Sequence, residues 1–98
     1  MFKKSDKRRL YWLIDLYLSE EINAWTFCNE FHIIYDIEIN YKKLTKLEYE
    51  AFSQLAKVAS RFTDIEEDLI KYPGVYHTKE ELTNAIIEIQ EKLKKEST

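Results

Sequence analysis

The sequence predicts an all-α fold, a small antiparallel bundle of four or five helices that forms a single domain over residues 1–98. Apolar residues recur at spacings of three and four, and Thr-x-x-Glu patterns, which are typical of helix starts, occur three times. The chain holds one glycine and one proline, although average usage predicts roughly seven glycines at this length. This scarcity disfavours the many tight turns of a β-sandwich or barrel, and it excludes glycine-rich phosphate loops.

The first helix is expected to begin after Ser5 and to end near Leu18. Eight of the nine residues from Leu10 to Leu18 are apolar or aromatic, so this helix is expected to be covered on more than one side. Asp15, the one polar residue in the run, is predicted to face solvent.

The preceding basic residues imitate a secretory signal, but Asp15 interrupts the run and no small-x-small cleavage site follows. The run is also far shorter than the roughly 20 residues of a membrane span, so we expect a cytoplasmic protein without membrane contact.

The second helix is predicted from Ala24 to about Ile37, with Asn23 as its N-cap. Its apolar residues follow the three-and-four spacing of one helix face: Ala24, Phe27, Cys28, Phe31, Ile34 and Tyr35. Apolar and polar residues then alternate from Ile37 to Tyr41. This alternation fits a short strand, but no partner strand is evident, so an extended link is the expected structure.

Three capping boxes predict the starts of the remaining helices. They pair Thr45 with Glu48, Thr63 with Glu66, and Thr78 with Glu81. The third helix carries its apolar stripe at Ala51, Phe52, Leu55, Ala56, Ala59 and Phe62. The last helix carries Leu82, Ala85, Ile86, Ile89 and Leu93 on one face, and residues 94–98 are expected to fray.

The fourth helix is expected to be short. It would begin at Asp64 and place Ile65, Leu69 and Tyr72 toward the core. The Pro73-Gly74 pair, which directly follows Tyr72, is predicted to end it in a turn.

The net charge of −3 hides a strong segregation of charge along the chain. Residues 1–9 carry +4, residues 10–91 carry −9, and residues 92–98 carry +2. The basic segment, treated as an N-terminal extension over residues 1–8, could contact nucleic acid, and a nucleic-acid-associated adaptor is therefore the alternative function. The acidic body repels phosphate, so direct nucleic-acid binding is not expected.

Cys28, His32 and Asp36 stand four residues apart on the second helix, a spacing that raises the question of a metal site or a catalytic thiol. Cys28 lies on the apolar stripe, where a free cysteine behaves as a small hydrophobe. The only other histidine, His77, lies in a distant turn, so a metal site would lack ligands. We therefore expect no enzyme activity, no cofactor and no metal.

Four acidic residues, Asp64, Glu66, Glu67 and Asp68, form the densest cluster of like charge. Two interpretations are open: the acids favour the first turn of a helix through its dipole, or they form a negative surface that binds a basic partner. Tyr41, Tyr72 and Tyr76 lie in or beside predicted turns and are expected to be exposed, and tyrosine is a frequent interface anchor.

Several segments over roughly residues 8–93 follow the order of a known family. The more specific ones are the Ile22-x-Ala24-x-x-Phe27 start of the second helix and the Arg61-Phe62 pair followed by acids and Tyr72. The others are Leu13-Ile14-Asp15-Leu16-Tyr17-Leu18, Leu55-Ala56 and Glu91-Lys92-Leu93. In these segments the chain resembles the colicin D immunity family. The chain departs from the family in its basic N-terminal extension and in a longer link between the second and third helices.

The resemblance implies an immunity protein, an antitoxin that binds the nuclease domain of a bacteriocin or of a contact-dependent growth inhibition toxin. For the colicin D type, the toxin cleaves tRNA anticodon loops, and acids of the immunity protein fill its basic cleft in place of tRNA phosphates. The matching acids are Asp64, Glu66 and Asp68, with Glu67 adjacent. Together with Tyr72 and Tyr76, these four acids form the expected toxin-binding site.

Overall fold

The computed structural model describes residues 3–96, and every helix or strand element in this range is helical. The elements are α1 (Arg8–Leu18), α2 (Ala24–His32), the π-helix η1 (Ile33–Glu38), the 3₁₀-helix η2 (Tyr41–Lys43), α3 (Lys46–Ser60), α4 (Glu66–Lys71) and α5 (Lys79–Glu96). The predicted all-α bundle is therefore confirmed. Within residues 3–96, no helix combines the length and apolar character needed to cross a bilayer.

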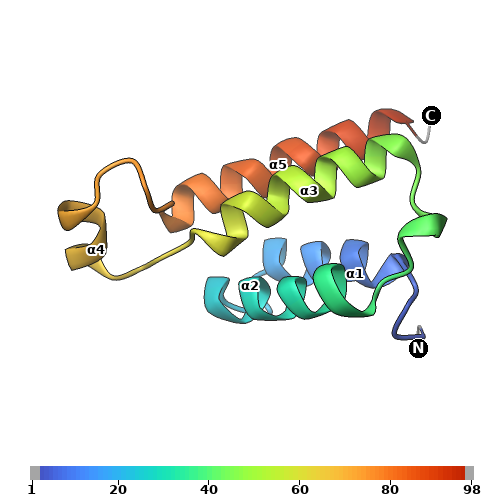
Figure 1. The fold of residues 1–98 in the computed structure, drawn as a ribbon, viewed down its shortest axis with the longest axis horizontal. Coiled ribbons are helices and arrows are strands. Elements are labelled where there is room, and N and C mark those ends of the chain that lie inside the picture. Colours follow the sequence, from blue (N-terminus) through green and yellow to red (C-terminus); the bar gives the residue numbers. More distant parts are fainter. Residues whose placement is uncertain (1–2, 97–98) are drawn as a thin grey trace.

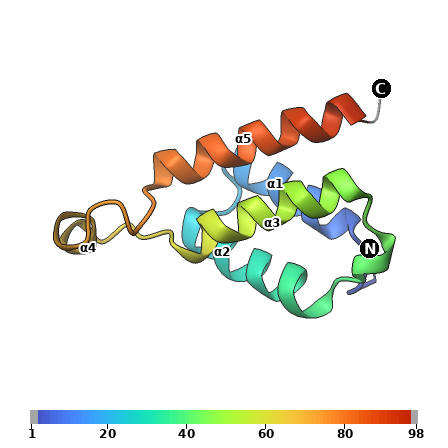
Figure 2. The same cartoon turned by 45° about the horizontal axis from the view of Figure 1, so that its top comes forward.

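The four long helices form two layers (Figures 1 and 2). α1 and α2 run antiparallel in one layer, and α3 and α5 run antiparallel in the other. The apolar core lies between the layers, and α4 lies apart at one end of a molecule with extents of 40 × 25 × 24 Å. Both termini and η2 lie at the opposite end.

The helix α1 begins at Arg8, later than the predicted start after Ser5. The carboxylate of Asp6 accepts a hydrogen bond from the backbone N–H of Arg8 at 2.9 Å, so Asp6 satisfies a donor that the helix itself leaves unpaired. Leu10, Leu13, Ile14 and Tyr17 are buried, whereas Asp15 faces solvent as predicted.

The helix α2 matches its prediction closely at its start. Asn23 accepts a hydrogen bond from the Thr26 backbone N–H at 2.8 Å, which confirms the N-cap. All six residues of the predicted apolar stripe are buried: Ala24, Phe27, Cys28, Phe31, Ile34 and Tyr35.

The extended link predicted from Ile37 to Tyr41 is wrong over most of its length. Residues 37 and 38 belong to η1, and Tyr41 opens η2. The Ile39 backbone N–H bonds to the Ile34 carbonyl at 2.8 Å, five residues back, and the wider π-turn leaves the Ile39 side chain buried. Only Ile39 and Asn40, between the two short helices, keep the extended backbone that the alternation predicted.

Two of the three predicted capping boxes are present. The Thr45 hydroxyl accepts from the Glu48 backbone and the Glu48 carboxylate accepts from the Thr45 backbone; Thr78 and Glu81 repeat this pattern. The predicted core faces are buried or half-buried: Ala51, Phe52, Leu55, Ala56, Ala59 and Phe62, then Leu82, Ala85, Ile86, Ile89 and Leu93. The predicted fraying is wrong for residues 94–96, which continue α5, and residues 97–98 lie outside the described residues.

Candidate functional site

Residues 64–76 form a loop, here called the acidic loop, that projects from one end of the bundle and contains α4 (Figures 1 and 2). Its two ends are joined at a neck by a parallel bridge between Phe62 and His77. The Thr63 N–H donates to the His77 carbonyl at 3.0 Å, and the His77 N–H donates to the Arg61 carbonyl at 2.7 Å. The neck therefore fixes the base of the loop to the ends of α3 and α5.

The capping box predicted at Thr63 and Glu66 is wrong, and α4 begins at Glu66 and not at Asp64. A capping box requires the glutamate to accept from the threonine N–H, but in this structure that N–H bonds to His77 across the neck. The Thr63 hydroxyl, which is buried, accepts from the Ile65 N–H at 3.1 Å and donates to the Asp68 carboxylate at 3.3 Å. Thr63 thus organises the loop from its base.

The inward orientation predicted for α4 is also wrong. Ile65 is 50% exposed and Tyr72 is 45% exposed, while Leu69 is half-buried. α4 has no buried residues, because a helix of six residues that projects from the bundle has no facing layer on which to pack. Ile70 and Val75 are exposed as well, so the loop presents apolar side chains to solvent.

The predicted turn closes the far side of the loop. The Val75 N–H donates to the Tyr72 carbonyl at 3.2 Å, with Pro73 second and Gly74 third in the turn. Gly74 has φ of +81°, and a proline followed by a left-handed glycine is typical of a type II turn. The Tyr72 and Tyr76 rings meet edge to face at 6.0 Å.

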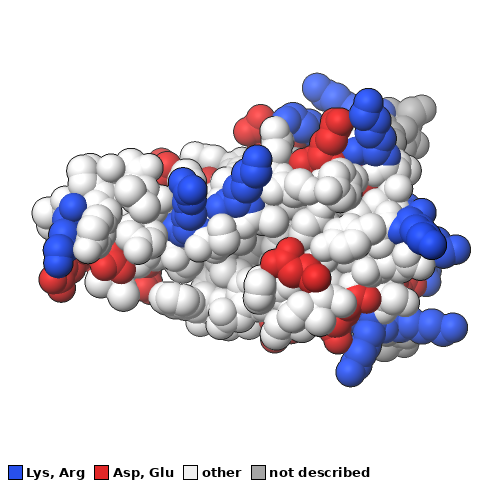
Figure 3. All heavy atoms as spheres, viewed as in Figure 1, with Lys and Arg blue, Asp and Glu red and all other residues white. Residues whose placement is uncertain are grey.

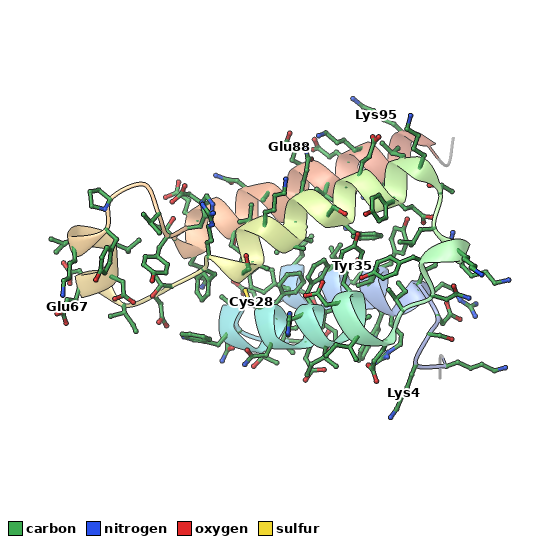
Figure 4. The ribbon with its side chains drawn as sticks, viewed as in Figure 1. Lys4, Cys28, Tyr35, Glu67, Glu88 and Lys95 are labelled. Carbon is green, nitrogen blue, oxygen red and sulfur yellow. The ribbon has the colours of Figure 1, made fainter. Side chains whose placement is uncertain are left out.

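The structure brings the six predicted toxin-binding residues together on the acidic loop: Asp64, Glu66, Glu67, Asp68, Tyr72 and Tyr76. Asp64, Glu66 and Glu67 are exposed and, among residues 3–96, form no ion pair. Asp68 is half-buried against Thr63. Figure 4 places Glu67 at the outer end of the molecule, and acidic side chains line the lower edge of that end in Figure 3.

The tyrosines predicted to be exposed are divided between two regions. Tyr72 is exposed and Tyr76 is half-buried, both on the acidic loop. Tyr41 is exposed but lies in η2 at the opposite end, where its hydroxyl donates to the Tyr35 carbonyl. Tyr41 therefore does not contribute to the acidic loop.

Three cations of the basic residues 1–9 pair with carboxylates of the bundle: Lys7 with Glu48 at 2.8 Å, Arg9 with Glu38 at 2.8 Å, and Lys4 with Glu38 at 4.0 Å. Arg8 pairs with Asp6 within the segment, at 2.6 Å. Figure 3 shows Lys and Arg side chains gathered at this end. These internal pairs reduce the positive charge that the segment offers to a phosphate backbone.

Glu48 is a buried carboxylate whose wider role the sequence reasoning missed. Beyond its capping bond, it accepts from the Lys7 ammonium at 2.8 Å and from the Tyr11 hydroxyl. Burial alone raises the pKa of Glu48, but the hydrogen bonds from Lys7, from the Thr45 backbone and from Tyr11 outweigh burial and hold this pKa below its ordinary value. The capping pattern identified Glu48 as a helix cap. Its contact with Lys7 could not be predicted in this way, because Lys7 lies 41 residues away along the chain.

Cys28, His32 and Asp36 do not form one reactive group. Cys28 lies in the core, where burial raises the pKa of its thiol to about 11 and keeps it protonated at neutral pH. His32 Nδ1 lies 2.6 Å from a carboxylate oxygen of Asp36, and both side chains are solvent-accessible. In the described part of the chain, no group of three or more His, Cys, Asp or Glu residues is placed to hold a metal ion.

No model of a known protein family matches this chain, and neither a curated protein nor a solved structure matches it.

Proposed function

We propose that this protein is an immunity-type inhibitor that binds the basic active-site cleft of a cognate tRNA-cleaving toxin domain in the cytoplasm and has no enzyme activity of its own. The observation that carries the proposal is the set of exposed carboxylates without ion pairs, Asp64, Glu66 and Glu67, on a loop with a fixed base. The family resemblance in the sequence supports the nuclease as the partner.

The charge state of these carboxylates suits them to bind a cationic cleft. A nuclease that holds RNA must present Lys and Arg to phosphates, and carboxylates accept charge-assisted hydrogen bonds from the same groups. Because Asp64, Glu66 and Glu67 form no internal ion pair within residues 3–96, no such pair has to break before they bind. Opposite charge also accelerates encounter with the toxin.

The shape of the loop supports the same conclusion. The loop extends beyond the two helical layers, so it can enter a concave site that the broad bundle could not enter (Figure 2). Its exposed apolar side chains, such as Ile70 and Val75, add area that a partner can bury around the charges.

The test begins with the open reading frame next to this gene: if that frame encodes a nuclease domain, inhibition of the domain is measured as tRNA cleavage against inhibitor concentration. The triple variant Asp64→Lys, Glu66→Lys and Glu67→Lys is expected to raise the inhibition constant about 100-fold or more, because each reversal replaces attraction by repulsion. Asp68 is left intact because it bonds to Thr63 inside the loop.

The matched control is Glu50→Lys, Glu88→Lys and Glu91→Lys, which makes the same change in net charge on exposed residues of α3 and α5. This control is expected to inhibit nearly as well as the wild-type chain. Equal inhibition by the loop variant and the control would refute the loop as the binding site. Failure of the wild-type chain to inhibit the nuclease would refute the proposed function.

A further inference from the structure

A groove of about 430 Å³ lies between α2 and α3, directly beside the neck of the acidic loop. Trp25, Ala56, Ala59 and Phe62 contribute to its walls. Trp25 is 45% exposed, although its ring meets the Phe62 ring edge to face at 5.7 Å. Phe62 takes part in the neck itself, so the groove continues into the base of the loop.

The charge around the groove restricts the kind of partner that can occupy it. Asp36 and its neighbour His32 are the charged or titratable side chains of the lining, beside the thiol of Cys28, and the lining contains no Lys or Arg. The adjoining loop carries Asp64, Glu66 and Glu67. A nucleic acid or an anionic membrane would meet like charge at the acidic loop, whereas a basic protein domain would meet opposite charge there.

A stable interface also needs more residues than the acidic loop alone can supply. A typical protein–protein interface buries about 800 Å² on each partner and involves roughly 20–30 residues a side. The acidic loop spans residues 64–76 only, so a stable complex must extend onto the bundle. The groove can supply part of that additional surface, because its wall residue Phe62 also belongs to the neck.

We propose that the groove at Trp25 receives an apolar side chain of the same basic toxin domain that the acidic loop binds; this inference rests on the proposed function. The two parts of the surface then act differently. The loop carboxylates accelerate association through charge, whereas burial of Trp25 slows dissociation, because tryptophan is a frequent energetic anchor at interfaces.

The test uses surface plasmon resonance with the 98-residue chain and the nuclease domain identified in the neighbouring reading frame. Asn29→Arg places a long cation on the exposed rim of the groove, and Trp25→Ala removes its aromatic wall. Both variants are expected to raise Kd about tenfold or more, mainly through a faster dissociation rate. A higher Kd for Asn29→Arg is not expected to come from a loss of folding. Asn29 is exposed, and its replacement leaves the contact between Trp25 and Phe62 intact.

The matched control is Thr26→Arg, on the same helix and with the same change in charge, at an exposed residue outside the groove lining. Its Kd is expected to stay within about twofold of the wild-type value. Equal Kd values for Asn29→Arg and Thr26→Arg would overturn the groove inference while toxin binding through the loop stands. A dimer of the free chain that Asn29→Arg dissociates would also overturn it, and absence of toxin binding by the wild-type chain would overturn both proposals.

Discussion

Acidic side chains at the two ends of the molecule's long axis differ in whether they have cationic partners. At the end with both termini, Glu38 and Glu48 accept hydrogen bonds from Arg9 and Lys7. At the other end, Glu66 and Glu67 are exposed and form no ion pair within the described residues. In Figure 4, Lys4 of the terminal end and Glu67 of the acidic loop lie far apart along this axis.

Carboxylates at the two ends therefore have two different roles, one in stability and one in binding. A buried carboxylate with several donors holds distant segments together, because an unpaired charge in the same place would be costly. An exposed carboxylate without a partner adds little to the stability of the chain, and its full charge remains available to another molecule. We therefore expect substitutions at the terminal end to change folding and substitutions at the loop end to change binding.

Among carboxylates, the largest expected difference in stability between the ends is that between Glu48→Ala and Glu67→Ala. Glu48→Ala removes the acceptor for Lys7, Tyr11 and the Thr45 N–H, and we expect a loss of about 2–3 kcal/mol in the free energy of unfolding. Glu67→Ala is expected to change it by less than about 0.5 kcal/mol. Urea unfolding followed by circular dichroism measures both, and similar losses would contradict the contrast.

The dependence of stability on pH provides a second, smaller difference. The pKa of Glu48 in the folded chain lies below its ordinary value of 4.5. Its stabilising contribution is therefore complete above pH 4.5 and is lost as the pH falls through the lower, folded-state pKa. Glu48→Gln is expected to show a shallower fall in unfolding free energy below pH 4.5 than the wild-type chain.

Glu67→Gln is the control for this pH experiment. It removes an exposed carboxylate that forms no ion pair among residues 3–96, so the contribution of Glu48 to the acid sensitivity is expected to remain in this variant. A Glu48→Gln curve parallel to that of the wild-type chain would show that Glu48 does not carry the acid sensitivity.

The sequence was sufficient to predict the features that depend on neighbours along the chain. Asn23 caps α2 through Thr26, and Thr45 pairs with Glu48 across one turn, so each pattern contains both partners within a few residues. The same local pattern failed at Thr63, because its N–H bonds to His77, which lies 14 residues further on and crosses the neck. Helical periodicity and capping patterns contain no information about a hydrogen-bond partner so far along the chain.

At the candidate site too, the sequence predicts the features that depend on nearby residues and misses those that depend on distant contacts. The acidic residues and Tyr72 were predicted because they lie close together in sequence. Their projection from the bundle was not predicted, since the spacing of Ile65, Leu69 and Tyr72 is that of an inward helix face. The groove at Trp25 and Phe62 was also missed, because two residues 37 positions apart carry no shared sequence signal.

A third difference concerns the shape of the acidic loop. Gly74 has φ of +81°, so Gly74→Ala is expected to destabilise the turn by about 1–2 kcal/mol even though an added Cβ meets nothing within 4 Å. Hydrogen exchange at the Val75 N–H, which bonds to Tyr72, should accelerate. Amides of α3 should keep their rates because α4 has no buried residues. Equal acceleration in α3 would show that the loop and the bundle unfold together.

Ile70→Ala is expected to affect stability as little as Glu67→Ala does. Ile70 is 72% exposed, so its truncation is expected to change the free energy of unfolding by less than about 0.5 kcal/mol. The same truncation at Ile86, which is 0% exposed on α5, is expected to cost about 2–5 kcal/mol through lost burial and a cavity. If Ile70→Ala lowers toxin affinity without lowering stability, the apolar surface of the loop serves binding, as its charge does. A loss of stability at Ile70 comparable to that at Ile86 would mean that the loop packs against the bundle in solution and would contradict its projection.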